Sequence, residues 1–187
     1  MLVIDLSETE FFNDETDEFV TIKPMQLQFE HSLISISKWE ATWNKPYLAH
    51  NDKTKEELLD YIRCMVISKG FDPRFVYALN ADQMKEISEY INKSQTATWF
   101  SKEADAEFYR RNGRGDGNVI TSEVIYYLMV ACQIPFECQK WHLSRLLTLI
   151  RVYQEKNKDT EKMSKADILK RNRELNAARR KALGTRG

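Results

Sequence analysis

One cysteine–histidine pair in this sequence has a spacing that could support chemistry. Cys138 and His142 are four positions apart, so one face of a helix would present both. Together with Cys64 or Cys132 they could approach a zinc site, but structural zinc normally takes four ligands in two closely spaced pairs. A Cys–His nucleophile would need an exposed thiolate in an electropositive setting. We therefore expect an inert, buried Cys138 thiol and no metal site.

Two other patterns suggest chemistry only at first sight. The glycine-rich run at 113–117 lacks the spacing and the Lys-Ser/Thr pair of a phosphate-binding loop, and it does not follow a predicted strand. Neighbouring carboxylates occur at 14–15, 17–18 and 56–57, but they lie in hydrophilic runs where the pKa shift that acid–base catalysis needs is not expected. We expect no catalytic residue, no cofactor and no enzyme activity.

The elements that would position these side chains begin with a β region. Apolar and polar residues alternate at Leu2–Leu6 and Met25–Phe29, and Phe19–Ile22 also reads as a strand after an acidic turn at 13–17. Pro24 interrupts the alternation and favours an edge or a bulge. Because an isolated hairpin is marginally stable, we expect this small sheet to pack on helices or on a partner.

Helical periodicity follows from Ser32 onward. The first predicted helix is capped by Ser32 and ended by Pro46, and the second is opened by the capping box Thr54–Glu57. The third covers 81–92 and is capped by Asn80. The fourth is opened by Thr121 or Ser122, and the fifth runs from Pro135 to Tyr153. The last two should form a helical hairpin at the centre of the fold. Residues 101–118 contain three glycines and many charges, which predicts a mobile loop.

The sequence therefore predicts an α+β, predominantly helical fold. A small antiparallel β element (1–30) would pack on a helical core (31–155), and a basic C-terminal helix (156–187) would follow, opened by Ser164 and closed by Gly184. This division also separates charge. Residues 1–30 carry eight acidic residues and one basic residue, and residues 156–187 carry eleven basic and four acidic residues, so formal charges of −7 and +7 stand at the two ends.

The composition favours a soluble protein of a reducing compartment. Three cysteines cannot all pair within one chain. The longest apolar stretch, at 124–132, is far shorter than the roughly 20 residues of a membrane helix, so we expect no membrane association. The net charge of zero gives the whole chain no attraction to nucleic acid. Only the basic segment at 165–181 could follow phosphates, and no aromatic residue interleaves with its bases.

Several strings resemble the tail assembly chaperones of long-tailed bacteriophages. They are Phe29–Glu40 (FEHSLISISKWE) with Trp43–Pro46, Tyr61–Met65, Thr96–Ser101 (TATWFS), Ile134–Leu143 (IPFECQKWHL), Arg145–Arg151 and Leu175–Arg180, and together they span most of the chain. The resemblance implies a non-catalytic protein of the host cytoplasm. It would coat the helical tape-measure protein, keep it soluble and recruit tail-tube subunits during assembly.

Alternatives stay open at this point. The chain could be a minor structural protein of the virion tail or connector, or a nucleic-acid-binding protein acting through its basic C-terminal helix, and it could form a homo-oligomer. For partner binding we expect an anchor among Trp39, Trp43 and Trp99, because Trp is enriched at binding hot spots. Trp141 is expected in the core. Arg171, Arg179 and Arg180 are the basic candidates.

Overall fold

The computed structural model describes residues 1–13, 17–49, 52–113, 119–157 and 173. The chain divides into two units, Met1–Val152 and Tyr153–Gly187. The predicted C-terminal helix from Ser164 lies outside the described residues, as do the glycines at 115 and 117. The architecture below is that of the first unit.

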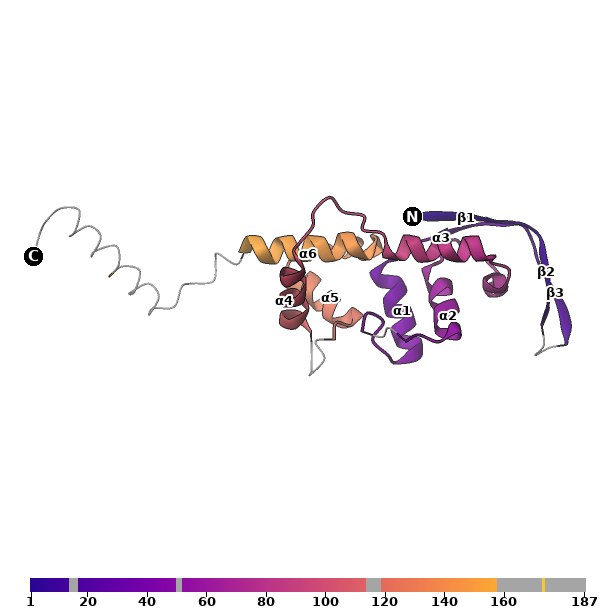
Figure 1. Cartoon of the computed structure of the whole chain (residues 1–187), viewed down its shortest axis with the longest axis horizontal. Coiled ribbons are helices and arrows are strands. Elements are labelled where there is room, and N and C mark those ends of the chain that lie inside the picture. Colours follow the sequence, from indigo (N-terminus) through magenta and orange to yellow (C-terminus); the bar gives the residue numbers. More distant parts are fainter. Residues whose placement is uncertain (14–16, 50–51, 114–118, 158–172, 174–187) are drawn as a thin grey trace, which may run out of the picture. The chain divides into compact units, whose positions relative to one another are not determined.

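A long, bent hairpin forms the β part. Strand β1 (Leu2–Leu6) pairs antiparallel with β4 (Met25–Phe29), and β2 (Thr9–Asn13) pairs antiparallel with β3 (Glu18–Ile22). The chain bends between the two ladders, where Pro24 interrupts the returning strand, and Figure 1 shows β2 and β3 turning away from β1. The three strands predicted from the sequence are present. Strand β2 was missed, because it lies against the expected acidic turn.

Six helices and two 3-10 helices follow the hairpin in the described residues. Their bounds are α1 Leu33–Trp43, α2 Lys55–Met65, η1 Pro73–Tyr77, α3 Ala81–Asn92, α4 Lys102–Asn112, α5 Ser122–Ala131, η2 Phe136–Lys140 and α6 Leu143–Asn157. Ser32 and Asn80 cap α1 and α3 as predicted, and Thr54 and Glu57 form the predicted capping box of α2. The mixed, mostly helical α+β fold is confirmed.

Helix α1 lies at the centre of the core. Its Leu33, Ile36 and Trp39 side chains are fully buried, and α2, α5 and η2 all pack against it. The prediction that the last two helices form a hairpin at the centre is therefore wrong: η2 separates them, and α5 packs on α1 instead. Helix α3 runs beside β1 in both views, and the Gln83 side chain donates to the Asp5 carbonyl at 3.1 Å.

Helix α4 occupies most of the segment predicted to be a loop. Ser101 caps it, acidic residues (Glu103 and Asp105) lie in its first turn, and basic residues (Arg110 and Arg111) lie in its last turn. This arrangement of charge complements the helix dipole, which helps to form a helix that has few apolar residues. The loop prediction relied on the three glycines and the many charges, and it overlooked the Ser101 cap and the order of acidic and basic residues along the segment. Only 114–118 of that segment lies outside the described residues.

Candidate partner-binding surface

Buried rings meet where the end of β4 and the starts of α1 and α6 come together. We call His31, Tyr47, Tyr61 and His142 the ring cluster. His31 Nδ1 lies 2.5 Å from the Tyr61 hydroxyl, and the two imidazole centroids are 5.1 Å apart. Burial, helped by the adjacent His142, lowers the pKa of His31 to about 3, and burial raises the pKa of both tyrosines. The cluster is therefore uncharged at neutral pH and acts as packed core.

His142 serves as a structural cap at the start of α6. Its Nε2 donates to the Tyr90 carbonyl at 3.2 Å, which leaves Nδ1 as an acceptor. The Ser144 hydroxyl, 2.8 Å away, and the Ser144 backbone N–H both donate to Nδ1. The Ser144 oxygen in turn accepts from the Gln95 backbone N–H. The contact between Ser144 and His142 therefore supplies hydrogen-bond partners at the first turn of α6 and joins Gln95 to that turn. Both imidazole nitrogens of His142 have hydrogen-bond partners.

The cysteines do not come together as a site. Cys138 is buried in η2, and His142 follows that 3-10 helix, so the two residues do not share a helix face as their spacing suggested. Burial raises the pKa of all three thiols, that of Cys64 to about 11. A thiol with a raised pKa is a weak nucleophile at neutral pH. Among the described residues, no three or more His, Cys, Asp or Glu side chains are placed to hold a metal ion.

Two predicted anchors lie on α1, Trp39 within the core and Trp43 packed against it. Trp39 is fully buried and donates from Nε1 to the Glu57 carbonyl at 2.8 Å. Trp43, which is half-buried, stacks on Trp39 and donates to the Asp60 carboxylate at 3.0 Å. Trp39 therefore offers no surface to a partner, and this candidate is wrong. The indole N–H of each ring already has an internal partner, so α1 uses both rings for packing.

A buried carboxylate that the sequence did not reveal joins α1 to α5. Glu40 accepts from the backbone N–H of Tyr47 at 2.8 Å and from that of Ser122 at 2.7 Å. Ser122 is the first residue of α5, where Thr121 makes no side-chain cap. A negative charge is stabilised at a helix N-terminus, so Glu40 caps α5 from another helix. No local sequence pattern links positions that lie so far apart.

Helix α5 has an exposed apolar face. Glu123 is its only charged residue, and the helix is apolar nearly all round, a composition usual for buried helices. Yet Tyr127 is 70% exposed and Val130 is 62% exposed. Phe136 of η2 is also exposed, and its ring lies 6.3 Å from that of Tyr126 on α5. We call Tyr127, Val130 and Phe136 the α5 surface.

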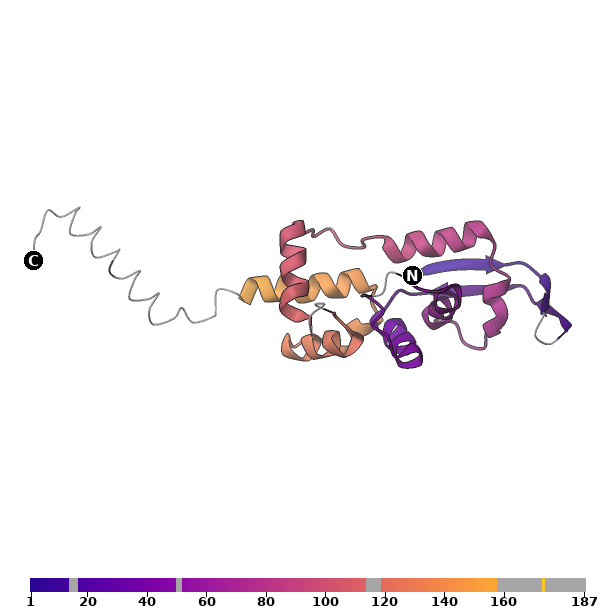
Figure 2. The same ribbon diagram turned by 60° about the horizontal axis from the view of Figure 1, so that its bottom comes forward.

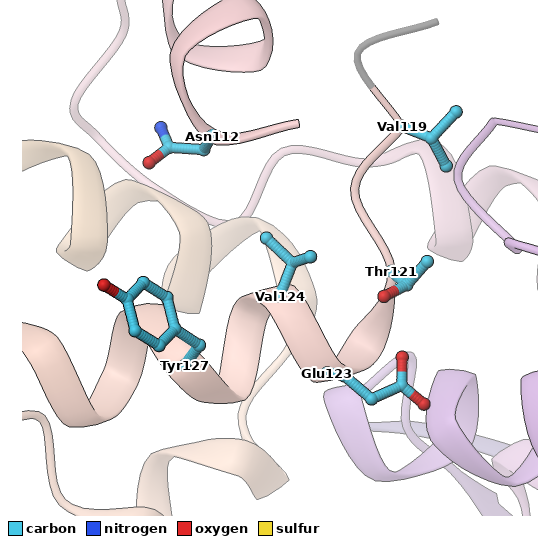
Figure 3. A pocket seen from close by; sticks show the side chains of 6 residues that line it. All are labelled: Asn112, Val119, Thr121, Glu123, Val124 and Tyr127. Atoms are coloured by element: carbon cyan, nitrogen blue, oxygen red, sulfur yellow. The ribbon is translucent and has the colours of Figure 1, made fainter. Parts of the chain in front are cut away.

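A hollow adjoins this surface. Its cavity volume is about 700 Å³, and its described lining residues are Asn112, Val119, Thr121, Glu123, Val124 and Tyr127. Figure 3 shows Val124 and Tyr127 on α5, with Asn112 at the end of α4 across from them. The lining combines apolar side chains with a carboxylate and an amide, which suits an apolar helix face with a few polar contacts.

Trp99 is the predicted anchor that does reach solvent, being 85% exposed. It lines a second cleft of about 290 Å³ with Phe100, Phe108 and Arg151. The Arg151 guanidinium lies 3.7 Å from the centre of the Phe100 ring and is ion-paired with Asp105. Because Arg151 already has these internal partners, the cleft offers apolar and hydroxyl groups rather than a free cation. Trp99 stays a candidate anchor.

Two other sets of predicted residues have different outcomes. Trp141, expected in the core, is 37% exposed and lies beneath the Arg145 guanidinium, 4.9 Å from it. Arg171, Arg179 and Arg180 lie outside the described residues.

The α5 surface was not predicted as a site. Its signal in the sequence is the run 124–132, which contains no charged residue although it is far too short for a membrane helix.

Comparisons with known proteins add no family. Searches of protein-family models, of curated proteins and of solved structures found no match to this chain. In the described part of the chain, every helix is too short or too polar to cross a membrane.

Proposed function

We propose that this chain is a tail assembly chaperone of a long-tailed bacteriophage. It would bind the tape-measure protein in the host cytoplasm, keep it soluble and recruit tail-tube subunits without catalysing a reaction. The observation that carries the proposal is the α5 surface, an apolar patch left in solvent beside a hollow, with the exposed Glu123 one turn before Tyr127. The resemblance of the strings at 29–46, 96–101 and 134–151 supports the same assignment.

The α5 surface suits a helical partner. A long coiled protein presents apolar side chains at spacings of three and four residues, and such a stripe fits a groove lined by aliphatic and aromatic groups. Tyr127 and Phe136 offer rings that bind with little loss of side-chain freedom, and Val130 lies between Tyr127 and the end of α5. Trp99 would supply a second, separate anchor.

Co-expression with the tape-measure protein of the same genome tests the proposal. The wild-type chain should co-purify with the tape measure and increase its soluble fraction. Tyr127→Glu places a charge in the apolar contact, and truncating or charging a hot spot costs at least about 2 kcal/mol, so co-purification should fall roughly thirtyfold. The matched control is Ser88→Glu, which adds the same charge at an exposed position of α3.

The outcomes separate the proposal from its rivals. No complex with the wild-type chain, or equal loss with the Ser88 control, would contradict it. Mass spectrometry of purified particles gives a second check, because an assembly chaperone should be absent and a minor structural protein should be present. The rival of nucleic-acid binding rests on the segment at 165–181 and predicts affinity for DNA that falls steeply with salt.

A further inference from the structure

Strands β2 and β3 form an arm with two different faces. On the inner face Val20 and Ile22 are buried, and the Phe11 ring lies 5.7 Å from that of Tyr77 in η1. These contacts tie the arm to the body of the first unit. A two-stranded hairpin is marginal alone, so the inner face accounts for the stability of the arm.

The outer face carries an aromatic pair in solvent. Phe12 and Phe19 are opposite each other in the ladder, and their ring centroids are 5.2 Å apart. Phe12 is 45% exposed and Phe19 is 70% exposed. A cross-strand aromatic pair stabilises a hairpin by about 0.2–1 kcal/mol, which explains the contact between the rings. It leaves most of the Phe19 ring available to a partner.

Charge decides which partner fits this aromatic face. Residues 8–23 contain six acidic residues and one basic residue, a formal charge of −5. A second copy of the arm would bring like charges together, which disfavours self-association. A basic segment would be attracted instead. Among basic side chains, the planar guanidinium of arginine stacks on aromatic rings and pairs with carboxylates at the same time, which lysine does less well.

We propose that the outer face of the arm binds an arginine-rich segment of a partner protein. Guanidinium groups stack on Phe12 and Phe19 while the carboxylates of Glu10 and Asp17 balance their charge. Glu10 shares the outer face with Phe12, since residues two apart in a strand point the same way. This contact goes beyond the proposed function and is separate from the α5 surface.

The test compares two labelled peptides, deca-arginine and deca-lysine, by fluorescence anisotropy with the full chain. Both should bind, and binding should weaken as salt is raised. Deca-arginine should bind about two- to fivefold more tightly, the factor expected for stacking at an exposed site. Absence of binding by either peptide, or equal affinity for both, would overturn the proposal.

Variants locate the site. Glu10→Gln and Asp17→Asn together should weaken both peptides about fivefold, since exposed ion pairs contribute about 0.2–1 kcal/mol each. Asparagine tolerates the left-handed conformation of residue 17, whose φ is 56°. The matched control neutralises two exposed α3 residues, Asp82 and Glu86, in the same way. Equal weakening by the control would show attraction to net charge alone and would overturn the proposal.

A second pair of variants isolates the rings. Phe12→Ile with Phe19→Ile keeps the strand propensity and apolar character of the arm but removes both aromatic faces. Deca-lysine affinity should stay unchanged, and the preference for arginine should disappear. A preference that survives would exclude stacking on these rings. Stronger binding by Arg179→Glu with Arg180→Glu would mean that the chain's own basic segment occupies the arm, which would also overturn the proposal.

Discussion

The ring cluster and the α5 surface use the same kinds of side chain in opposite ways. In the ring cluster the Tyr61 hydroxyl is hydrogen-bonded to His31, and both nitrogens of His142 have partners. Trp39, packed against Tyr47 of the cluster, donates to a backbone carbonyl. On the α5 surface, Tyr127 and Val130 remain in solvent. Aromatic residues therefore indicate an interface here only where the fold leaves them exposed.

The largest expected effect lies on the buried side of this comparison. Trp39→Ala removes a fully buried indole together with its hydrogen bond to the Glu57 carbonyl. Such truncations cost about 3–5 kcal/mol, so the urea midpoint should fall sharply or folding should fail. Trp39→Phe keeps most of the volume and is the conservative control. A loss below about 1 kcal/mol for Trp39→Ala would show that α1 is not the centre of the core.

A pH effect of intermediate size should come from the same region. Burial holds the pKa of His31 at about 3, below its ordinary value of 6.5. The unfolded chain takes up a proton on His31 near pH 6.5 and the folded chain does not. The stability that neutral His31 contributes is therefore complete above pH 6.5 and is lost as pH falls toward 3. Each pH unit in that window should lower the free energy of unfolding by about 1.4 kcal/mol.

The matched comparison is His31→Gln, measured by urea unfolding at pH 7, 6 and 5. Its stability at pH 7 should be lower than that of the wild type, because the Tyr61 contact changes. Its free energy of unfolding should fall less steeply as pH is lowered, because one proton fewer is taken up on unfolding. His142, whose pKa is lowered by burial although the hydrogen bond to the Tyr90 carbonyl and the charge of Glu30 raise it, remains in both proteins. Parallel pH profiles would show that His31 is not held neutral in the fold.

Local signals in the sequence predicted the caps but not the packing. The Thr54–Glu57 box, Ser32 and Asn80 involve atoms within one helical turn, so the residue types alone specify them. The burial of Trp39 and the exposure of Tyr127 depend on which face of each helix meets α1 or solvent, which no short pattern encodes. Glu40 is the clearest example: it caps α5 from a helix 82 positions earlier in the chain.

The candidate site followed the same rule. The cysteine–histidine spacing assumed one continuous helix, whereas the structure places Cys138 in the 3-10 helix η2, which ends at Lys140 before His142. Trp99 was found from its type alone, whereas the α5 surface was missed because an apolar helix is normally read as core. Exposure is a property of the tertiary fold, and it changed which aromatic residues are candidates for binding.

The smallest expected effect on stability comes from the exposed side, and this makes it the sharpest test of the comparison. Tyr127→Ser removes a ring that is 70% exposed and adds a side chain that water accommodates, so the free energy of unfolding should change by no more than about 0.5 kcal/mol. The same variant should lose tape-measure binding. If it destabilised the chain as Trp39→Ala does, Tyr127 would be core and the α5 surface would not be a docking site. Unchanged stability together with lost binding would identify an interaction residue, because a packing residue cannot give both results.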